Sequence, residues 1–189
     1  QANWIISPLS ASLALGMTAN GAAGNTLEEI KNTLGFGTFE LAAMNSYNQK
    51  LIKELLDLDN TTRLNIANSV WLNNSLPVND SFVEVNKDMY DAPVSSVDLN
   101  SSKSIELINN WAAQQTNNAI KNVISQVPSG AMFYMLNALY FKGIWKKQFK
   151  TTVTKEEIFT NADRSSARIP MMNQQETFNY IYNDNFCIA

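Results

Sequence analysis

The sequence predicts an α+β fold, in which helices and strands are largely segregated along the chain. Helix-type patterns crowd the first third of the chain, and strand-type patterns crowd the last third. An almost continuous apolar run occupies residues 131–145, where ten of the first eleven residues are apolar. The chain has neither a glycine-rich phosphate loop nor an internal repeat, which leaves α+β as the class.

Three helices are predicted in the first third. The first begins at Pro8 with Ser7 as its N-cap, because proline suits the first helical turn and a serine oxygen accepts from free backbone amides there. Small residues along this segment favour close packing on several sides, so we expect a buried helix. Thr26 is expected to cap the second helix and Thr38 the third, which covers residues 39–58.

The middle of the chain alternates between strand and helix signals. Apolar residues alternate with polar ones over residues 64–72, which predicts a long strand with one face on the core. Residues 93–99 predict an edge strand, because the segment starts with proline. Ser101 or Ser102 is expected to cap the next helix, which extends to Ile120. The remaining predicted elements are a short helix at residues 82–90 and two strands, residues 168–172 and 177–181, separated by a polar turn at residues 173–176.

The apolar run at residues 131–145 predicts the central strand of a large sheet. It is too short to cross a bilayer as a helix, and its continuous apolar character indicates that both faces are covered. Asn137 is the polar exception. Because a buried amide is costly unless it is hydrogen-bonded, Asn137 predicts polar partners from another element.

The composition predicts one globular domain with a sizeable core. The chain has 189 residues, of which 45% are hydrophobic, and a formal net charge of -3. Lys and Arg total 14 and form no run longer than Lys146-Lys147, so we expect no nucleic-acid partner. No segment of the sequence is long and apolar enough to predict a membrane span.

The residue types exclude the common hydrolytic sites. Histidine is absent, which removes the Ser-His-Asp and Cys-His pairs and the zinc-binding HExxH motif. The single cysteine, Cys187, cannot form an internal disulfide, and a small buried side chain is a commoner role for it than a reactive thiol. No nucleophile–base pair, metal cluster or cofactor loop is recognisable, so we expect no catalytic site, no metal and no cofactor.

Six short segments, taken together and in order, carry a family resemblance. They are residues 3–10 (NWIISPLS), 21–26 (GAAGNT), 67–68 (AN), 109–111 (NNW), 137–145 (NALYFKGIW) and 169–172 (IPMM). Together they resemble the serpin family of serine protease inhibitors. The resemblance implies a large central antiparallel sheet, smaller sheets and helices packed around them. The chain departs from the family at residues 116–120, which read TNNAI where serpins usually have TNGKI.

The resemblance covers about the first half of a serpin. Residues 1–189 are therefore expected to form a single incomplete serpin domain, which lacks most of the first helix and the C-terminal half with the reactive loop. The start at Gln1 and the end within an apolar run agree with a piece of a longer chain. Such a piece exposes strand edges, so we expect the truncated chain to self-associate.

The function implied by the resemblance is inhibition of a serine-type endopeptidase rather than enzyme activity. In this family a target serine protease, or in some cases a cysteine protease, cuts an exposed loop. The loop then inserts into the central sheet and traps the acyl-enzyme before it hydrolyses. The alternative is a non-inhibitory serpin that acts as a carrier, chaperone or storage protein. The hinge that distinguishes the two lies outside this chain.

The resemblance also assigns residues to two sites. Ser7, Ser10 and Asn137 match the shutter, a hydrogen-bonded cluster under the place where the sheet opens, and Trp145 matches the breach, where the loop first enters. The shutter histidine is expected in the missing half. Simpler roles stay open, since Ser7 caps a helix, Ser10 permits close packing and Trp145 fills core. Asn137 is the most diagnostic, because an apolar strand has no packing need for an amide.

The resemblance makes an extracellular, secreted protein the expectation. Four asparagines fit the N-glycosylation pattern Asn-X-Ser/Thr, namely Asn60, Asn73, Asn79 and Asn100. In a chain so rich in Asn and Ser, chance accounts for these matches, and they do not decide the compartment.

Overall fold

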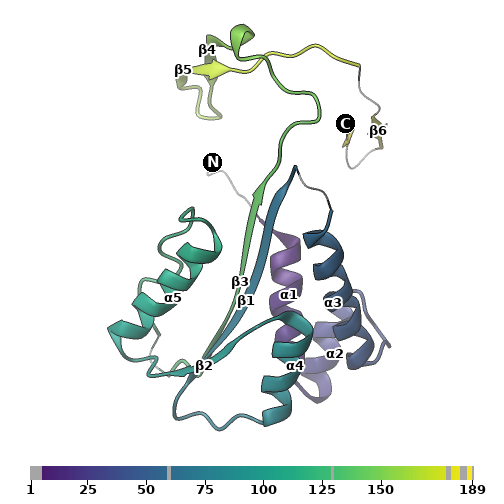
Figure 1. The fold of residues 1–189 in the computed structure, drawn as a ribbon, viewed down its shortest axis with the longest axis vertical. Coiled ribbons are helices and arrows are strands. Elements are labelled where there is room, and N and C mark those ends of the chain that lie inside the picture. The colour runs from purple at the N-terminus through teal and green to yellow at the C-terminus, as the bar shows by residue number, and fades with distance from the viewer. Residues whose placement is uncertain (1–5, 59–60, 129, 178–179, 184–186, 189) are drawn as a thin grey trace. The chain divides into compact units, whose positions relative to one another are not determined.

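The computed structural model describes residues 6–58, 61–128, 130–177, 180–183 and 187–188 (Figure 1). Residues 187 and 188 are described by their backbone alone. The chain divides into two compact units. The larger unit spans Ile5–Gly143, and the smaller contains Ile144–Ala189. Among the described residues, no helix has the length and apolar character needed to cross a membrane.

The larger unit contains the helices that the sequence predicts, with three of their caps formed by side chains. Ser7 caps the first helix, Asn79 the fourth and Ser101 the fifth, each by accepting a hydrogen bond from a backbone amide of the first turn. The helices are α1 (Pro8–Ala19), α2 (Gly24–Thr33), α3 (Leu41–Leu56), α4 (Asp80–Tyr90) and α5 (Ser102–Gln115).

Two of the predicted caps are wrong. Thr26 lies inside α2, which begins at Gly24 and is preceded by Ala23 without a side-chain cap. The positive φ of Gly24, 54°, lets the chain turn into the helix earlier than Thr26. Thr38 does not cap α3 either, because it lies within a tight turn closed by the Phe39 amide donating to the Phe36 carbonyl.

The fifth helix is shorter than predicted. It ends at Gln115, and Thr116 follows as its C-cap. The two residues after Thr116, Asn117 and Asn118, have φ values of 51° and 62°. This left-handed backbone cannot continue a helix. Ile120 therefore lies outside the helix, where it is 45% exposed.

The main sheet of the larger unit has three strands in the order β2-β1-β3. The strands are β1 (Arg63–Asn73), β2 (Val94–Val97) and β3 (Phe133–Lys142). β2 pairs in parallel with β1 at an edge of this sheet, as predicted, and β3 pairs with β1 in antiparallel orientation. The prediction of a central strand at residues 131–145 is wrong for the described part of the chain, because β1 is the only neighbour of β3 there.

Helices cover both faces of β1, although its sequence pattern predicted one covered face. In the larger unit, α5 lies on one side of the β1–β3 pair and α1 to α4 lie on the other (Figure 1). Leu13, Ile66 and Val70 belong to the core on the side of α1, whereas Trp71 packs with Ile108 on the side of α5. Side chains that point to either face of β1 are therefore excluded from water.

The smaller unit consists of short strands with largely exposed side chains. A hairpin joins β4 (Lys155–Thr160) and β5 (Ser166–Met171). β5 confirms the strand predicted at residues 168–172, and β4 is a strand that the sequence analysis did not predict. A 3-10 turn, η1 (Thr151–Val153), precedes it, and β6 (Ile181–Tyr182) pairs with β7 (Cys187–Ile188). Of the strand predicted at residues 177–181, only Ile181 lies in β6, and residues 178–179 are outside the described residues.

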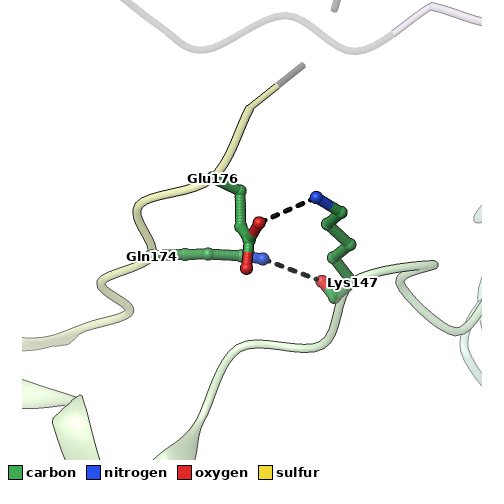
Figure 2. A network of polar contacts seen from close by, with 3 residues as sticks. All are labelled: Lys147, Gln174 and Glu176. Carbon is green, nitrogen blue, oxygen red and sulfur yellow. Dashed lines mark hydrogen bonds and ion pairs between the residues drawn. The ribbon is translucent and has the colours of Figure 1, made fainter.

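A polar contact ties two segments of the smaller unit together (Figure 2). Lys147 forms an ion pair of 2.7 Å with Glu176, and the Gln174 amide donates to the Lys147 carbonyl at 3.4 Å. The ion pair lowers the pKa of Glu176, first through the hydrogen bond from Lys147 and then through its charge. Both partners are partly exposed, so this pair stabilises the unit only slightly.

Candidate functional site

The site begins with an amide pair that joins the two long strands. Asn137 of β3 lies opposite Asn68 of β1 in the strand register. The Asn137 Nδ2 donates to Asn68 Oδ1 at 2.8 Å, and the Asn68 Nδ2 donates to the carbonyl of Tyr90 at 2.7 Å. Asn68 is 2% exposed. The prediction that Asn137 has a polar partner on another element is confirmed.

The two ends of the Asn137 amide differ in their hydrogen bonding. Its nitrogen is bonded to Asn68, whereas its Oδ1 is buried and has no hydrogen-bond partner among the residues that the structure describes. A buried polar atom left without a partner costs about 1–3 kcal/mol. The Asn137 oxygen is thus a position where a hydrogen-bond donor would be stabilising.

Behind the amide pair, Tyr90 forms the centre of a second polar group. Its side chain is 1% exposed. The hydroxyl donates to Asn45 Oδ1 at 2.8 Å and accepts from Asn48 Nδ2 at 3.0 Å. Burial raises the pKa of Tyr90 to about 12, although the hydrogen bond from Asn48 lowers it in part. The hydroxyl is therefore protonated at neutral pH and available as a donor.

Further amides extend this group across three helices. Asn45 of α3 donates to Asn20 Oδ1 at 2.8 Å, and Asn20 in turn donates to Asn86 Oδ1 of α4 at 3.3 Å. Asn20 follows α1 directly as its C-cap. We call Asn20, Asn45, Asn48 and Asn86 the asparagine layer. It links α1, α3 and α4 through side chains in an otherwise apolar interior.

A glycine of α1 makes room for this layer. A Cβ atom built at Gly16 would lie 2.7 Å from the Tyr90 hydroxyl and 3.0 Å from Asn48 Nδ2. Any larger residue would push the hydroxyl away from its partners, because the surrounding side chains are buried. Gly16 therefore permits the close approach of α1 to Tyr90.

The two serines assigned to the shutter lie at the start of α1. Ser7 is exposed, and its hydroxyl accepts from the Ser10 backbone amide at 3.2 Å, which is the helix cap. Ser10 is half-buried. Within the described ranges, no hydrogen bond joins either serine to Asn137. The structure thus brings Asn137 together with Asn68, and the shutter roles of Ser7 and Ser10 stay predictions.

Trp145, assigned to the breach, belongs to the smaller unit. Its indole is 65% exposed and packs edge-on against Phe149, with 5.4 Å between the ring centroids. The simpler role of filling core is wrong for the described residues, because one aromatic contact leaves most of the indole uncovered. The breach role stays a prediction.

Two other kinds of site remain, a metal site and the four asparagines that fit the N-glycosylation pattern. In the part of the chain that the structure describes, no cluster of three or more His, Cys, Asp or Glu side chains could hold a metal ion. Asn73 is 8% exposed and accepts from Ser75, whereas Asn79 and Asn100 are exposed. Asn60 lies outside the described residues.

Sequence reasoning missed the asparagine layer and Tyr90. The available signal is the pair Asn45 and Asn48, which are three residues apart and lie on the same face of α3 as the apolar Met44 and Ile52. Amides on an apolar helix face indicate a buried polar contact. The sequence does not show which residues of α1 and α4 complete it.

Comparisons with known proteins identify the family. The family profile described as Serpin (serine protease inhibitor) matches residues 1–188. Neuroserpin of Gallus gallus is 36% identical over 185 residues, which cover 94% of this chain and 44% of that protein. The chain belongs to the serpin family, and it spans about half the length of the curated relatives it matches.

Solved structures agree with this assignment. The structure of a loop C-sheet serpin polymer has a TM-score of 0.89 and 31% identity, and the match covers 99% of this chain and 49% of that chain. Native tengpin, a thermophilic serpin, has a TM-score of 0.86 and 31% identity, with 99% and 48% covered. The predicted fold is confirmed as roughly half of a serpin, with mixed helix and sheet.

Proposed function

We propose that the protein carrying this chain inhibits serine proteases, or cysteine proteases, by suicide-substrate trapping, and that it is not an enzyme. A cleaved reactive loop, outside these residues, inserts as a strand into the sheet that contains β1 and β3. The observation that supports this proposal best is the amide pair of Asn68 and Asn137. It places a polar contact at the junction of two strands in an apolar sheet.

The amide pair suits a sheet that must open. Two apolar side chains at this junction would stabilise the closed sheet by burial. They have no hydrogen bonds that could change partners when the strands separate. Amides carry donors and acceptors that exchange partners when strands move, so that two packings differ by only a small free energy. The Asn137 oxygen supports the same function, because it has no partner among the described residues and can accept a hydrogen bond from a donor in the rest of the domain.

The proposal also includes the two serines of α1 and Trp145. Ser7 and Ser10 lie at the start of α1, and the packing of α1 against β3 supports their proposed part in a shutter. Trp145 follows β3 by three residues, at the end where an inserting loop would arrive in the family. We further propose that the protein is secreted, the commoner setting of serpins, and meets its target protease outside the cell.

The test is covalent complex formation by the whole protein. It is incubated with a panel of trypsin-like, chymotrypsin-like, elastase-like and papain-like proteases, and the products are separated on a denaturing gel. An inhibitor gives a complex with one of them that survives boiling in SDS. The same protease with its nucleophile replaced by alanine is the control, because it cannot acylate.

A different result would replace the proposal. If the whole protein is cleaved by these proteases and no complex forms with any of them, inhibition is excluded. A non-inhibitory carrier, chaperone or storage role would then take its place, and heat stability that does not change on loop cleavage would support that role.

A further inference from the structure

We propose that Tyr90 is a positioning residue that couples the asparagine layer to the β1–β3 pair. Its hydroxyl is held by two amides of α3, and its carbonyl accepts from Asn68, which itself accepts from Asn137. Through these bonds Tyr90 sets how readily the two strands separate. This inference rests on the proposed function, because resistance to separation matters only in a sheet that opens.

The position of Tyr90 in α4 explains why one residue can serve both groups. Tyr90 is the last residue of α4, and the following Asp91 has a left-handed backbone with φ of 49°. Carbonyls in the last turn of a helix have no partner within the helix. The Tyr90 carbonyl is therefore free to accept from the Asn68 side chain, while the ring and hydroxyl project into the layer.

The hydroxyl end of Tyr90 is fixed on all sides. Asn48 is 1% exposed, Asn45 is 4% exposed and Gly16 lies in contact range of the hydroxyl. Removal of the hydroxyl oxygen takes one hydrogen-bond partner from each of the two amides. The hydrogen bonds continue from there to α1 and α4, so the anchor consists of three packed helices rather than one side chain.

These contacts form one continuous path from β3 to α1. It runs from Asn137 to Asn68, through the backbone and side chain of Tyr90, to Asn45 and then Asn20, and no bond along it is longer than 2.8 Å. None of the layer residues was assigned a role by the family resemblance. This path of buried and partly buried hydrogen bonds holds the strand pair only while Tyr90 keeps its position.

Hydrogen exchange of the whole protein tests the coupling. Tyr90→Phe removes one oxygen and keeps the carbonyl bond to Asn68. We expect backbone amides of residues 66–70 and 135–139 to exchange about 10-fold faster than in the wild type, with α5 amides unchanged. The matched control is Tyr134→Phe, because the Tyr134 hydroxyl has no hydrogen bond among the described residues, and its removal should leave strand exchange unchanged.

A second control separates positioning from general destabilisation. Ile108→Val shortens a fully buried side chain of α5 without touching the layer. The proposal is overturned if Tyr90→Phe accelerates exchange in α5 as much as in the strands, or if only α3 and α4 respond. If Tyr90→Phe does not fold, Asn48→Ala takes its place, because it removes one hydrogen bond to the Tyr90 hydroxyl. It must then accelerate exchange in residues 66–70 and 135–139 and leave α5 unchanged.

The exchange measurement needs no protease, so its outcome is independent of the inhibition test. A wild type that forms no covalent complex would remove the proposed function while strand exchange stays readable. If the wild type does inhibit, Tyr90→Phe should also change the fraction of protein cleaved without complex formation, which a purely local role would leave constant.

Discussion

Tyr90→Phe should make the stability of this protein less sensitive to alkaline pH. Burial raises the pKa of Tyr90 from 10.0 to about 12 in the folded protein. The unfolded chain therefore releases this proton at a lower pH than the folded chain. The stabilising contribution is complete below pH about 10 and is lost as the pH rises through about 12. Between pH 9 and pH 11, Tyr90 alone should lower the free energy of unfolding by about 1 kcal/mol.

Urea unfolding at about pH 9, 10 and 11, followed by tryptophan fluorescence, measures this contribution. Tyr90→Phe should be less stable than the wild type at pH 9, because Asn45 and Asn48 lose a partner. The difference in stability between the two proteins should narrow by about 1 kcal/mol at pH 11, since phenylalanine cannot ionise. Ile108→Val, which changes no ionisable group, should keep the pH dependence of the wild type.

A constant gap between wild type and Tyr90→Phe from pH 9 to pH 11 would refute this reasoning. It would mean that the Tyr90 phenol ionises equally well in the folded and unfolded chains, which requires contact with water. The asparagine layer would then not be a buried group, and the coupling inferred for Tyr90 would lose its structural basis.

Further substitutions test the other features. Gly16→Ala should lower the free energy of unfolding by about 1–3 kcal/mol, because its Cβ meets the Tyr90 hydroxyl at 2.7 Å; an unchanged melting temperature would mean that α1 can move away. In the whole protein, Asn137→Leu should change both the melting temperature and the rate of conversion to a latent form, and two unchanged values would count against a shutter role. Trp145→Ala in the 189-residue chain should cost less than about 1.5 kcal/mol, since its main contact is Phe149; a cost of about 3–5 kcal/mol would mean that the indole is covered. The 189-residue chain alone should self-associate through the free edge of β3, and a monodisperse monomer in sedimentation would contradict this.

Local signals in the sequence predict most of the elements of the larger unit. Ser7 followed by Pro8 marks the start of α1, and Ser101 marks the start of α5, because capping depends on residues a few positions apart. The failures at Thr26 and Thr38 have the same local origin. Threonine caps a helix only if the backbone enters the helix there, and nearby glycine conformations and turns shift that point.

The long-range features of the site are not predictable in the same way. Asn137 stands out because it interrupts an apolar run, but its partner Asn68 is 69 positions away and lies in a strand with other polar residues. Asn20, Asn45 and Asn86 meet only after three helices have packed. Single-sequence patterns give the face of each helix and not which faces meet.

The edge position of β3 and the state of Asn137 support the same interpretation. A side-chain amide carries a donor, Nδ2, and an acceptor, Oδ1, that point in different directions, so one side chain can bond to elements on two sides. In β3 the donor end is used toward β1, through Asn68, and the acceptor end is buried without a described partner. A leucine at this position would pack as well but could not distinguish one neighbour from another. Under the proposed function, a donor from the rest of the domain bonds to this oxygen in one arrangement of the sheet. That bond is exchanged when the sheet opens, while the bond to Asn68 keeps β3 in register with β1.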